Sequence, residues 1–317
     1  MPSLRRVERF NVVAGLILWT ATFIFSRPEP MQFAWPLYLI ALAVCCLAPF
    51  GRLVCLERNG LQSVPRWWLI AARIQFPSSL ILCATVEIDG STIRLVLAFP
   101  WRLVTTLMAM QAWVLWRKSE TTFGEKVSLL GWLQLPVGAA WLLADFLQLQ
   151  PMGFDSQIVR LTAAHFHFAG FVLPLLAGFL ASNFDHLLVR VAAIGSALGV
   201  GLVATGITLT KLNFPPELES IFATTFCCFV LLLSVCQIIF AARQRSILIF
   251  ISGIALCVGT VFALLYALRL WIPLPWLHIP RMWAIHGSIQ VFGYAFCGLI
   301  GWWRIPLSSK NLPQQQI

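Results

Sequence analysis

The sequence predicts an all-α integral membrane protein, a polytopic bundle of about ten transmembrane helices with both termini in the cytoplasm. Hydrophobic residues make up 59% of its 317 positions and charged residues 11%, and the mean hydropathy is +0.84. A soluble domain is nearer half apolar and a quarter charged. The apolar residues fall into runs of bilayer-spanning length, and most cations lie in the short joints between these runs. The net charge of +10 therefore indicates membrane topology and no nucleic-acid partner.

The ten apolar runs follow one another along the whole chain. They cover approximately residues 10–26, 31–50, 66–88, 94–116, 127–149, 157–181, 188–210, 218–241, 246–268 and 281–303. The first run follows Arg5, Arg6 and Arg9 as in a signal peptide, but it is long and lacks a small-x-small cleavage site, so we interpret it as a retained anchor. We expect residues 1–312 to form one transmembrane domain and residues 313–317 a short disordered tail.

The orientation is predicted from the distribution of Lys and Arg. Fourteen of them lie at the N-terminus, in the joints after even-numbered runs, and after the tenth run, against six in the opposite joints. The positive-inside rule then places both termini in the cytoplasm. We expect a multi-pass protein of the cell membrane, which in a bacterium is the inner membrane.

Most ionisable side chains within the runs are predicted to share the outer half of the membrane. At 1.5 Å per residue, His165 and His167 lie some way inside the sixth run, and His286 enters the tenth run from the same side. Asp145 and Arg102 fall at comparable depths, and Glu87 and Arg160 lie at the outer boundary. Ionisable groups inside a membrane are costly and mark functional sites.

The helical period limits what the two neighbouring histidines can do together. Residues two apart point about 200° apart around a helix, so His165 and His167 face nearly opposite sides. They are not a two-ligand metal site, and the i, i+4 spacing of such sites is absent. We expect one of them to line a site with His286 and the other to support it, and the sequence leaves open which. His286 and Gln290 share one face.

Two stretches carry a family resemblance. Arg160-Leu-Thr-Ala-Ala-His165-Phe-His167-Phe-Ala-Gly-Phe and Met-Trp-Ala-Ile-His286-Gly-Ser-Ile-Gln290-Val-Phe-Gly-Tyr-Ala resemble the YndJ-like family of bacterial membrane proteins, as does Asp145 on the preceding run. The resemblance covers most of the chain. It implies a polytopic membrane fold and carries over no activity and no cofactor.

A weaker likeness concerns haem. Ala-His165-Phe-His167-Phe is similar to the Ala-His-Phe-His-Tyr run of subunit one of the haem–copper oxidases. Those enzymes use about six histidine ligands and a copper-binding His-Pro-Glu-Val-Tyr element, whereas this chain has five histidines and no such element. Oxidase activity is therefore excluded, but a single haem held by His286 with His165 or His167 remains an alternative.

Our principal hypothesis is a cofactor-independent acid–base enzyme that acts on a lipophilic small molecule entering from the outer leaflet. Isomerisation, cyclisation, dehydration and epoxide opening fit such a site. The expected catalytic residues are His165, His167, His286, Asp145 and Arg102, and the expected substrate-binding residues are Arg160, Gln290, Glu87, Trp101 and Trp283. A haem-binding redox or sensor protein is the alternative, and a transporter or receptor for a lipophilic ligand is a further one. Besides that molecule, membrane lipids are the expected partners. The nine cysteines form no C-x-x-C pair and are expected to pack as small apolar residues.

Overall fold

The chain folds into an all-helical bundle in which the described residues form no strand. The computed structural model describes residues 2–58, 66–87 and 91–305, of which residues 2, 3, 86, 87 and 91–97 are described by their backbone alone. Nine helices of the described part are long and apolar enough to cross a membrane. Helix α5, Ser91–Trp116, is a further long helix, so ten helical runs follow the order that the hydropathy predicts.

Six runs are single α-helices, besides α5. They are α1 (Pro2–Ser26), α4 (Arg66–Glu87), α6 (Phe123–Phe146), α9 (Leu187–Lys211), α10 (Glu217–Gln244) and α11 (Ile247–Ala267). Each of the other three changes to a π-helix partway. These runs are α2 (Trp35–Leu42) with η1 (Ala43–Leu47) and α3 (Ala48–Arg58), then α7 (Ser156–His167) with η3 (Phe168–Val172) and α8 (Leu173–Asn183), then α12 (Ile279–Met282) with η4 (Trp283–Gly287), η5 (Ile289–Phe296) and α13 (Cys297–Arg304). A short 3₁₀ turn, η2 (Pro151–Gly153), precedes α7.

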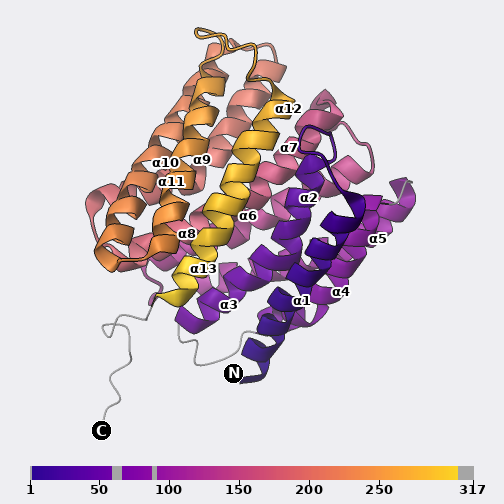
Figure 1. The fold of residues 1–317 in the computed structure, drawn as a ribbon, viewed down its shortest axis with the longest axis vertical. Coiled ribbons are helices and arrows are strands. Elements are labelled where there is room, and N and C mark those ends of the chain that lie inside the picture. The colour runs from indigo at the N-terminus through magenta and orange to yellow at the C-terminus, as the bar shows by residue number, and fades with distance from the viewer. Residues whose placement is uncertain (1, 59–65, 88–90, 306–317) are drawn as a thin grey trace.

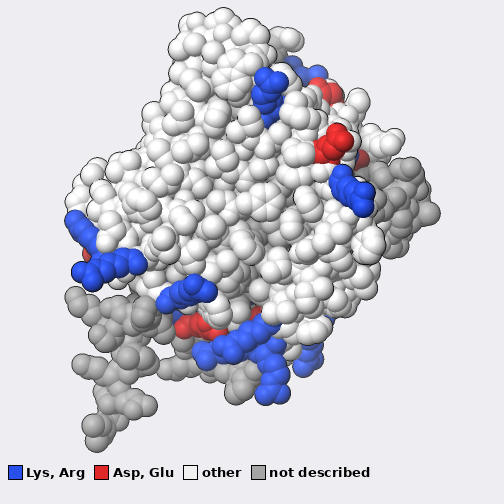
Figure 2. Space-filling model, in the orientation of Figure 1, with Lys and Arg blue, Asp and Glu red and all other residues white. Residues whose placement is uncertain are grey.

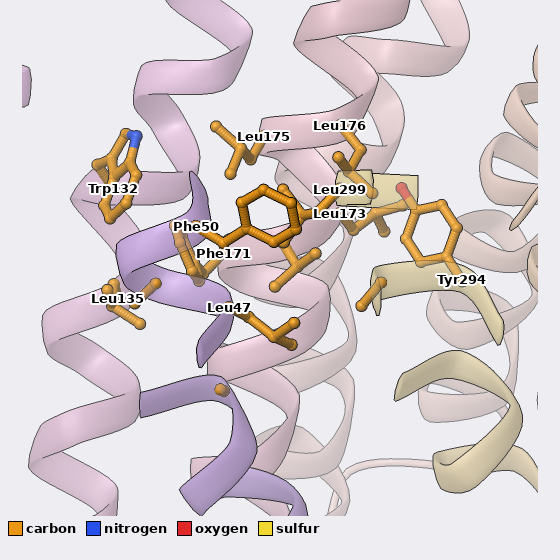
Figure 3. Packing of buried hydrophobic residues seen from close by; sticks show 14 of the residues in the cluster. Leu47, Phe50, Trp132, Leu135, Phe171, Leu173, Leu175, Leu176, Tyr294 and Leu299 are labelled. Carbon is orange, nitrogen blue, oxygen red and sulfur yellow. The ribbon is translucent and has the colours of Figure 1, made fainter. Parts of the chain in front are cut away.

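The run α2–η1–α3 is the most deeply buried element of the bundle. Every residue from Trp35 to Leu56 is buried, as expected of a helix that is apolar on all sides. Around it, Figure 1 shows α1, α4 and α5 on one flank, α9, α10 and α11 on the other, and α6, α8 and α13 between them. Residues from four runs meet in the core, where Phe171 packs 4.5 Å from Trp132 between ring centroids (Figure 3).

Helix α1 begins and α13 ends at the same end of the bundle, the lower end in Figure 1. On the face drawn in Figure 2, most of the Lys and Arg side chains also gather at this end. We call it the inner end and the opposite one the outer end. The arrangement is the one that the positive-inside rule anticipates, while the cytoplasmic placement of the termini stays a prediction.

Two arginines assigned to joints lie inside the bundle instead. Arg52 belongs to α3 and is 0% exposed, and Arg160 belongs to α7 and is 9% exposed. The second predicted run ends at residue 50, before Arg52, whereas the sixth begins at residue 157 and already contains Arg160, which was counted with the outer joint only because it lies near that end. Each of these cations has a buried carboxylate partner, and the pairing allows the helix to continue past it.

Candidate functional site

The three predicted histidines lie on two runs, and each run changes from an α-helix to a π-helix close to them. Asp155 caps α7, its Oδ1 accepting from the backbone N–H of Ile158 at 2.9 Å. Helix α7 ends at His167, and the π-helix η3 then leads into α8, which has Pro174 in its first turn. His286 lies within a second π-helix, η4. π-Helical turns are rare and frequent at functional sites, so both histidine motifs have an unusual backbone.

His167 is the buried member of the two neighbouring histidines. It is 0% exposed, its Nδ1 lies 2.8 Å from the carbonyl of Ala163, and its Nε2 lies 3.0 Å from the indole Nε1 of Trp101. A carbonyl only accepts and an indole N–H only donates, which assigns the proton to Nδ1 and leaves Nε2 as the acceptor. Both ring nitrogens are thus occupied, and the ring is neutral and fixed in place.

His165, unlike His167, is exposed. Its Nδ1 lies 2.7 Å from the carbonyl of Leu161, which assigns the proton to Nδ1. No described residue makes a hydrogen bond with its Nε2. The neutral ring therefore presents an accessible lone pair at the side of α7 opposite His167, as the helical period requires.

His286 is arranged in the same way on the last run. Its Nδ1 lies 2.7 Å from the carbonyl of Gly259 on α11, and in the described part of the chain its Nε2 has no hydrogen-bond partner. Gln290, one turn further on, directs its Nε2 toward Leu256 and Thr260 at 3.4 and 3.5 Å. Its Oε1 is buried and accepts no hydrogen bond from any residue that the structure describes. His286 and Gln290 together leave two acceptors unused.

The runs that carry His165 and His286 pack together, because η3, which follows α7, contacts η5, which follows η4. We call His165 and His286 the imidazole pair. With Gln290 Oε1 it presents acceptors and no donor, so a complementary ligand brings a hydroxyl, an acidic C–H or a cation. In the part of the chain described, no three His, Cys, Asp or Glu residues gather as a metal site.

Asp145 and Arg160 form a separate buried ion pair. Arg160 Nε donates to both carboxylate oxygens of Asp145, at 3.2 and 3.0 Å. Arg160 also donates to the carbonyl of Phe33 at 2.9 Å, with its guanidinium 3.8 Å from the centre of the Phe33 ring. The indole of Trp283 donates to the carbonyl of Pro30 at 2.9 Å. These contacts fasten residues 27–34, the segment between α1 and α2, to α7 and η4.

The remaining predicted residues are divided between other contacts. Trp101 is 1% exposed and holds His167. Arg102 is half-buried and donates to the carbonyl of Pro136 on α6 at 2.6 Å. The side chain of Glu87 lies outside the described residues. The structure thus places His165, His286 and Gln290 on two runs that pack together, and gives His167, Trp101, Asp145, Arg160, Arg102 and Trp283 contacts that hold helices and segments in place.

A cavity of about 310 Å³ lies between α7 and α9. Thr162 and Phe166 of α7 line it together with α9 residues such as Thr205 and Thr208. None of the predicted site residues is in its lining. The hydroxyls of Thr162, Thr205 and Thr208 donate to carbonyls in their own helices.

A buried polar network at the inner end of the bundle was not predicted from the sequence. Arg52 donates to Glu8 through Nε at 2.7 Å and through NH2 at 3.2 Å, and to Gln75 at 2.8 Å. Asn11 donates to Glu8 at 3.3 Å and to the carbonyl of Ala72 at 2.9 Å. Glu8 and Arg52 are both 0% exposed. The signal available in the sequence was the spacing of Glu8 and Asn11, which are three residues apart and therefore share one face of a helix.

Comparison with known proteins gives a family for the fold. The family model described as YndJ-like protein matches residues 30–294. The uncharacterized membrane protein YndJ of Bacillus subtilis (strain 168) is 28% identical over 227 residues, which are 70% of this chain and 40% of that relative. The chain thus matches less than half the length of this relative. No solved structure gives a significant match.

Proposed function

The chain belongs to the YndJ-like family of membrane proteins, and we propose that it binds a lipophilic small molecule at the imidazole pair and transfers a proton to or from it. The observation that carries the proposal is that His165 and His286 each donate Nδ1–H to a backbone carbonyl, while Nε2 has no hydrogen-bond partner among the described residues. A neutral imidazole is a base whose pKa in water lies near neutral pH, so it accepts and returns protons.

Two imidazoles suit a reaction that moves one proton between two positions of a substrate. One Nε2 removes a proton from the substrate, and the imidazolium so formed discourages a second positive charge on its neighbour. A substrate held between the rings therefore meets one base and, after the first transfer, one acid. Isomerisation and elimination both require this combination, and Gln290 Oε1 offers an acceptor for a hydroxyl of the substrate.

The surrounding contacts support a preformed site. Backbone carbonyls fix both rings, and fixed rings lose less entropy on binding than mobile ones. The bond from Arg160 to Phe33 and the bond from Trp283 to Pro30 hold the 27–34 segment against the two runs that carry the imidazoles, and Asp145 fixes Arg160. In this proposal Asp145, Arg160 and Trp283 are positioning residues, and His165 and His286 are the catalytic residues.

A haem held by the same two rings is the second candidate. A histidine ligand commonly donates its other ring N–H to a carbonyl, which fixes the tautomer and makes the ligating nitrogen more basic. His165 and His286 both have this arrangement, whereas the Nε2 of His167 is occupied by Trp101. His165 and His286 would hold the haem, and the haem would supply electron transfer or gas binding at this site.

The experiment compares lipophilic extracts of cells that express the wild type, His165→Ala or His286→Ala, grown in deuterated water and analysed by mass spectrometry. An acid–base enzyme converts a lipophilic metabolite into a product that carries solvent deuterium. Loss of a general base or acid costs about 10²–10⁴-fold in rate, so the labelled product falls by at least about 10²-fold in either variant. His186→Ala is the matched control, because His186 is exposed and caps α9.

An absorption spectrum of the purified protein separates the two candidates. An intense band near the blue end of the visible spectrum that disappears in His165→Ala and persists in His186→Ala establishes haem and excludes cofactor-free catalysis. A colourless protein that binds a lipophile without changing the labelled products is a transporter or receptor. Extracts that do not differ, from a colourless protein that binds no lipophile, contradict a ligand site at the imidazole pair.

A further inference from the structure

Two cysteines face each other in the N-terminal half of the bundle, on elements that do not contain the imidazole pair. Cys45 lies in η1 and Cys83 in α4, and their Sγ atoms are 3.4 Å apart. The two residues are 0% and 3% exposed. A disulfide has an S–S distance of about 2.05 Å, so a bond requires the sulfurs to approach by about 1.4 Å. Side-chain rotation and a small helix shift cover such a distance.

Neighbouring contacts hold the two elements in register around the thiols. Gln75, two turns before Cys83 on α4, donates to the carbonyl of Val44 at 2.8 Å. Cys45 Sγ lies 3.9 Å from the carbonyl of Ser79. On the other side, α1 packs so closely that a Cβ added to Gly15 would collide with the Cys45 carbonyl. The thiols are therefore brought together by the fold.

The position of the pair determines which reagents reach it. Cys45 lies near the middle of the Trp35–Arg58 span, in a part of the bundle without access to water. The same burial separates both sulfurs from the surrounding hydrocarbon, so any oxidant reaches them through an opening between the helices. A lipid-soluble quinone dissolves in the hydrocarbon next to such an opening, whereas a water-soluble oxidant or reductant would first have to cross the hydrocarbon. The adjacent Cys46 is equally buried but contacts no other sulfur among the described residues.

We propose that Cys45 and Cys83 form a redox-active dithiol that a lipid-soluble quinone oxidises to a disulfide. Two S–H bonds break and one S–S bond forms. The two electrons and two protons pass to the quinone, which leaves as the quinol. The bond joins the central run α2–η1–α3 covalently to α4 and adds a cross-link to contacts that are otherwise non-covalent.

The test uses the full-length protein in lipid vesicles, reduced and then freed of reductant. It is incubated without air with a fully ring-substituted quinone, which cannot add a thiol to its ring. The protein is then denatured, and its free thiols are counted with a maleimide that adds mass. We expect the wild type to lose two of its nine thiols, one quinol to form per protein, and dithiothreitol to restore both thiols. Cys46→Ser, the matched control, loses two thiols in the same way.

Cys45→Ser and Cys83→Ser are expected to lose none and to form no quinol. Peptide mapping of the oxidised wild type should show the two cysteines joined to each other. The proposal is overturned if the wild type keeps all its thiols, or if the loss persists in Cys45→Ser. Because neither variant touches the imidazole pair, the labelled-product assay reports on the proposed function independently.

Discussion

The buried pair of Glu8 and Arg52 makes the sharpest prediction about stability. Replacing Arg52 by Met leaves the Glu8 carboxylate with Asn11 as its hydrogen-bond donor among the described residues, in a place with no access to water. Breaking one partner of a buried ion pair costs about 3–5 kcal/mol, because the remaining charge is uncompensated. Arg52 also donates to Gln75 at 2.8 Å, so we expect the variant to fall in the upper part of this range.

The double variant Glu8→Leu with Arg52→Met tests the reason for that loss. It removes both charges and their desolvation cost, and replacing a buried pair with apolar residues of similar volume is often neutral. We therefore expect the double variant to be more stable than Arg52→Met alone. An effect of this sign arises only if the uncompensated charge, and no lost packing, dominates the cost.

The measurement is equilibrium unfolding in mixed micelles at increasing denaturing detergent, followed by the fluorescence of the fourteen tryptophans. The matched control is Arg190→Met, which breaks a pair with Asp185 whose side chains are 51% and 78% exposed. Exposed pairs contribute at most about 1 kcal/mol. If Arg52→Met destabilises the protein no more than Arg190→Met, or if the double variant is worse than the single one, the reasoning is refuted.

Two further predictions concern the histidines. Diethyl pyrocarbonate, which acylates accessible neutral imidazoles, is expected to modify His165 and His286 and to spare His167, as measured by peptide mass spectrometry; modification of His167 would contradict its closed pocket. Gly138→Ala places a Cβ 2.8 Å from the Nδ1 of His167, and overpacking of this kind costs about 1–3 kcal/mol. Gly201→Ala, whose Cβ meets nothing within 4 Å, should be neutral or stabilising by up to about 1 kcal/mol. Equal unfolding midpoints for the two alanine variants would exclude a tight fit around His167.

The order and number of the helical runs follow from the sequence because a bilayer imposes them locally. Each apolar run must satisfy its own backbone hydrogen bonds, and only a helix does so within one segment. The same argument does not fix where a run ends when a cation has a buried partner. Arg52 shows this limit, since its carboxylate partner, Glu8, lies on another helix.

Helical periodicity predicted that His165 and His167 have different surroundings, but it did not predict which of the two is enclosed. A spacing of two residues shows that the two rings point in different directions, but it does not show which residues each ring contacts. Trp101, far away in the chain, decides the assignment by occupying the Nε2 of His167. Asp145 was likewise grouped with the histidines only because it lies at a comparable depth in the membrane. In the fold its carboxylate forms an ion pair with Arg160.

The sequence by itself determined the class of protein, the ten helical runs and the opposite directions of the two neighbouring histidines, because hydrophobicity and helical period act within one segment. Tertiary structure decided which imidazole keeps a free nitrogen, which charges are paired, and which two of nine cysteines meet. Each of these depends on residues distant in the chain, and hydrogen bonds, ion pairs and sulfur contacts act only over a few ångströms. The partner that the packing supplies therefore determines the chemistry available to each of these side chains.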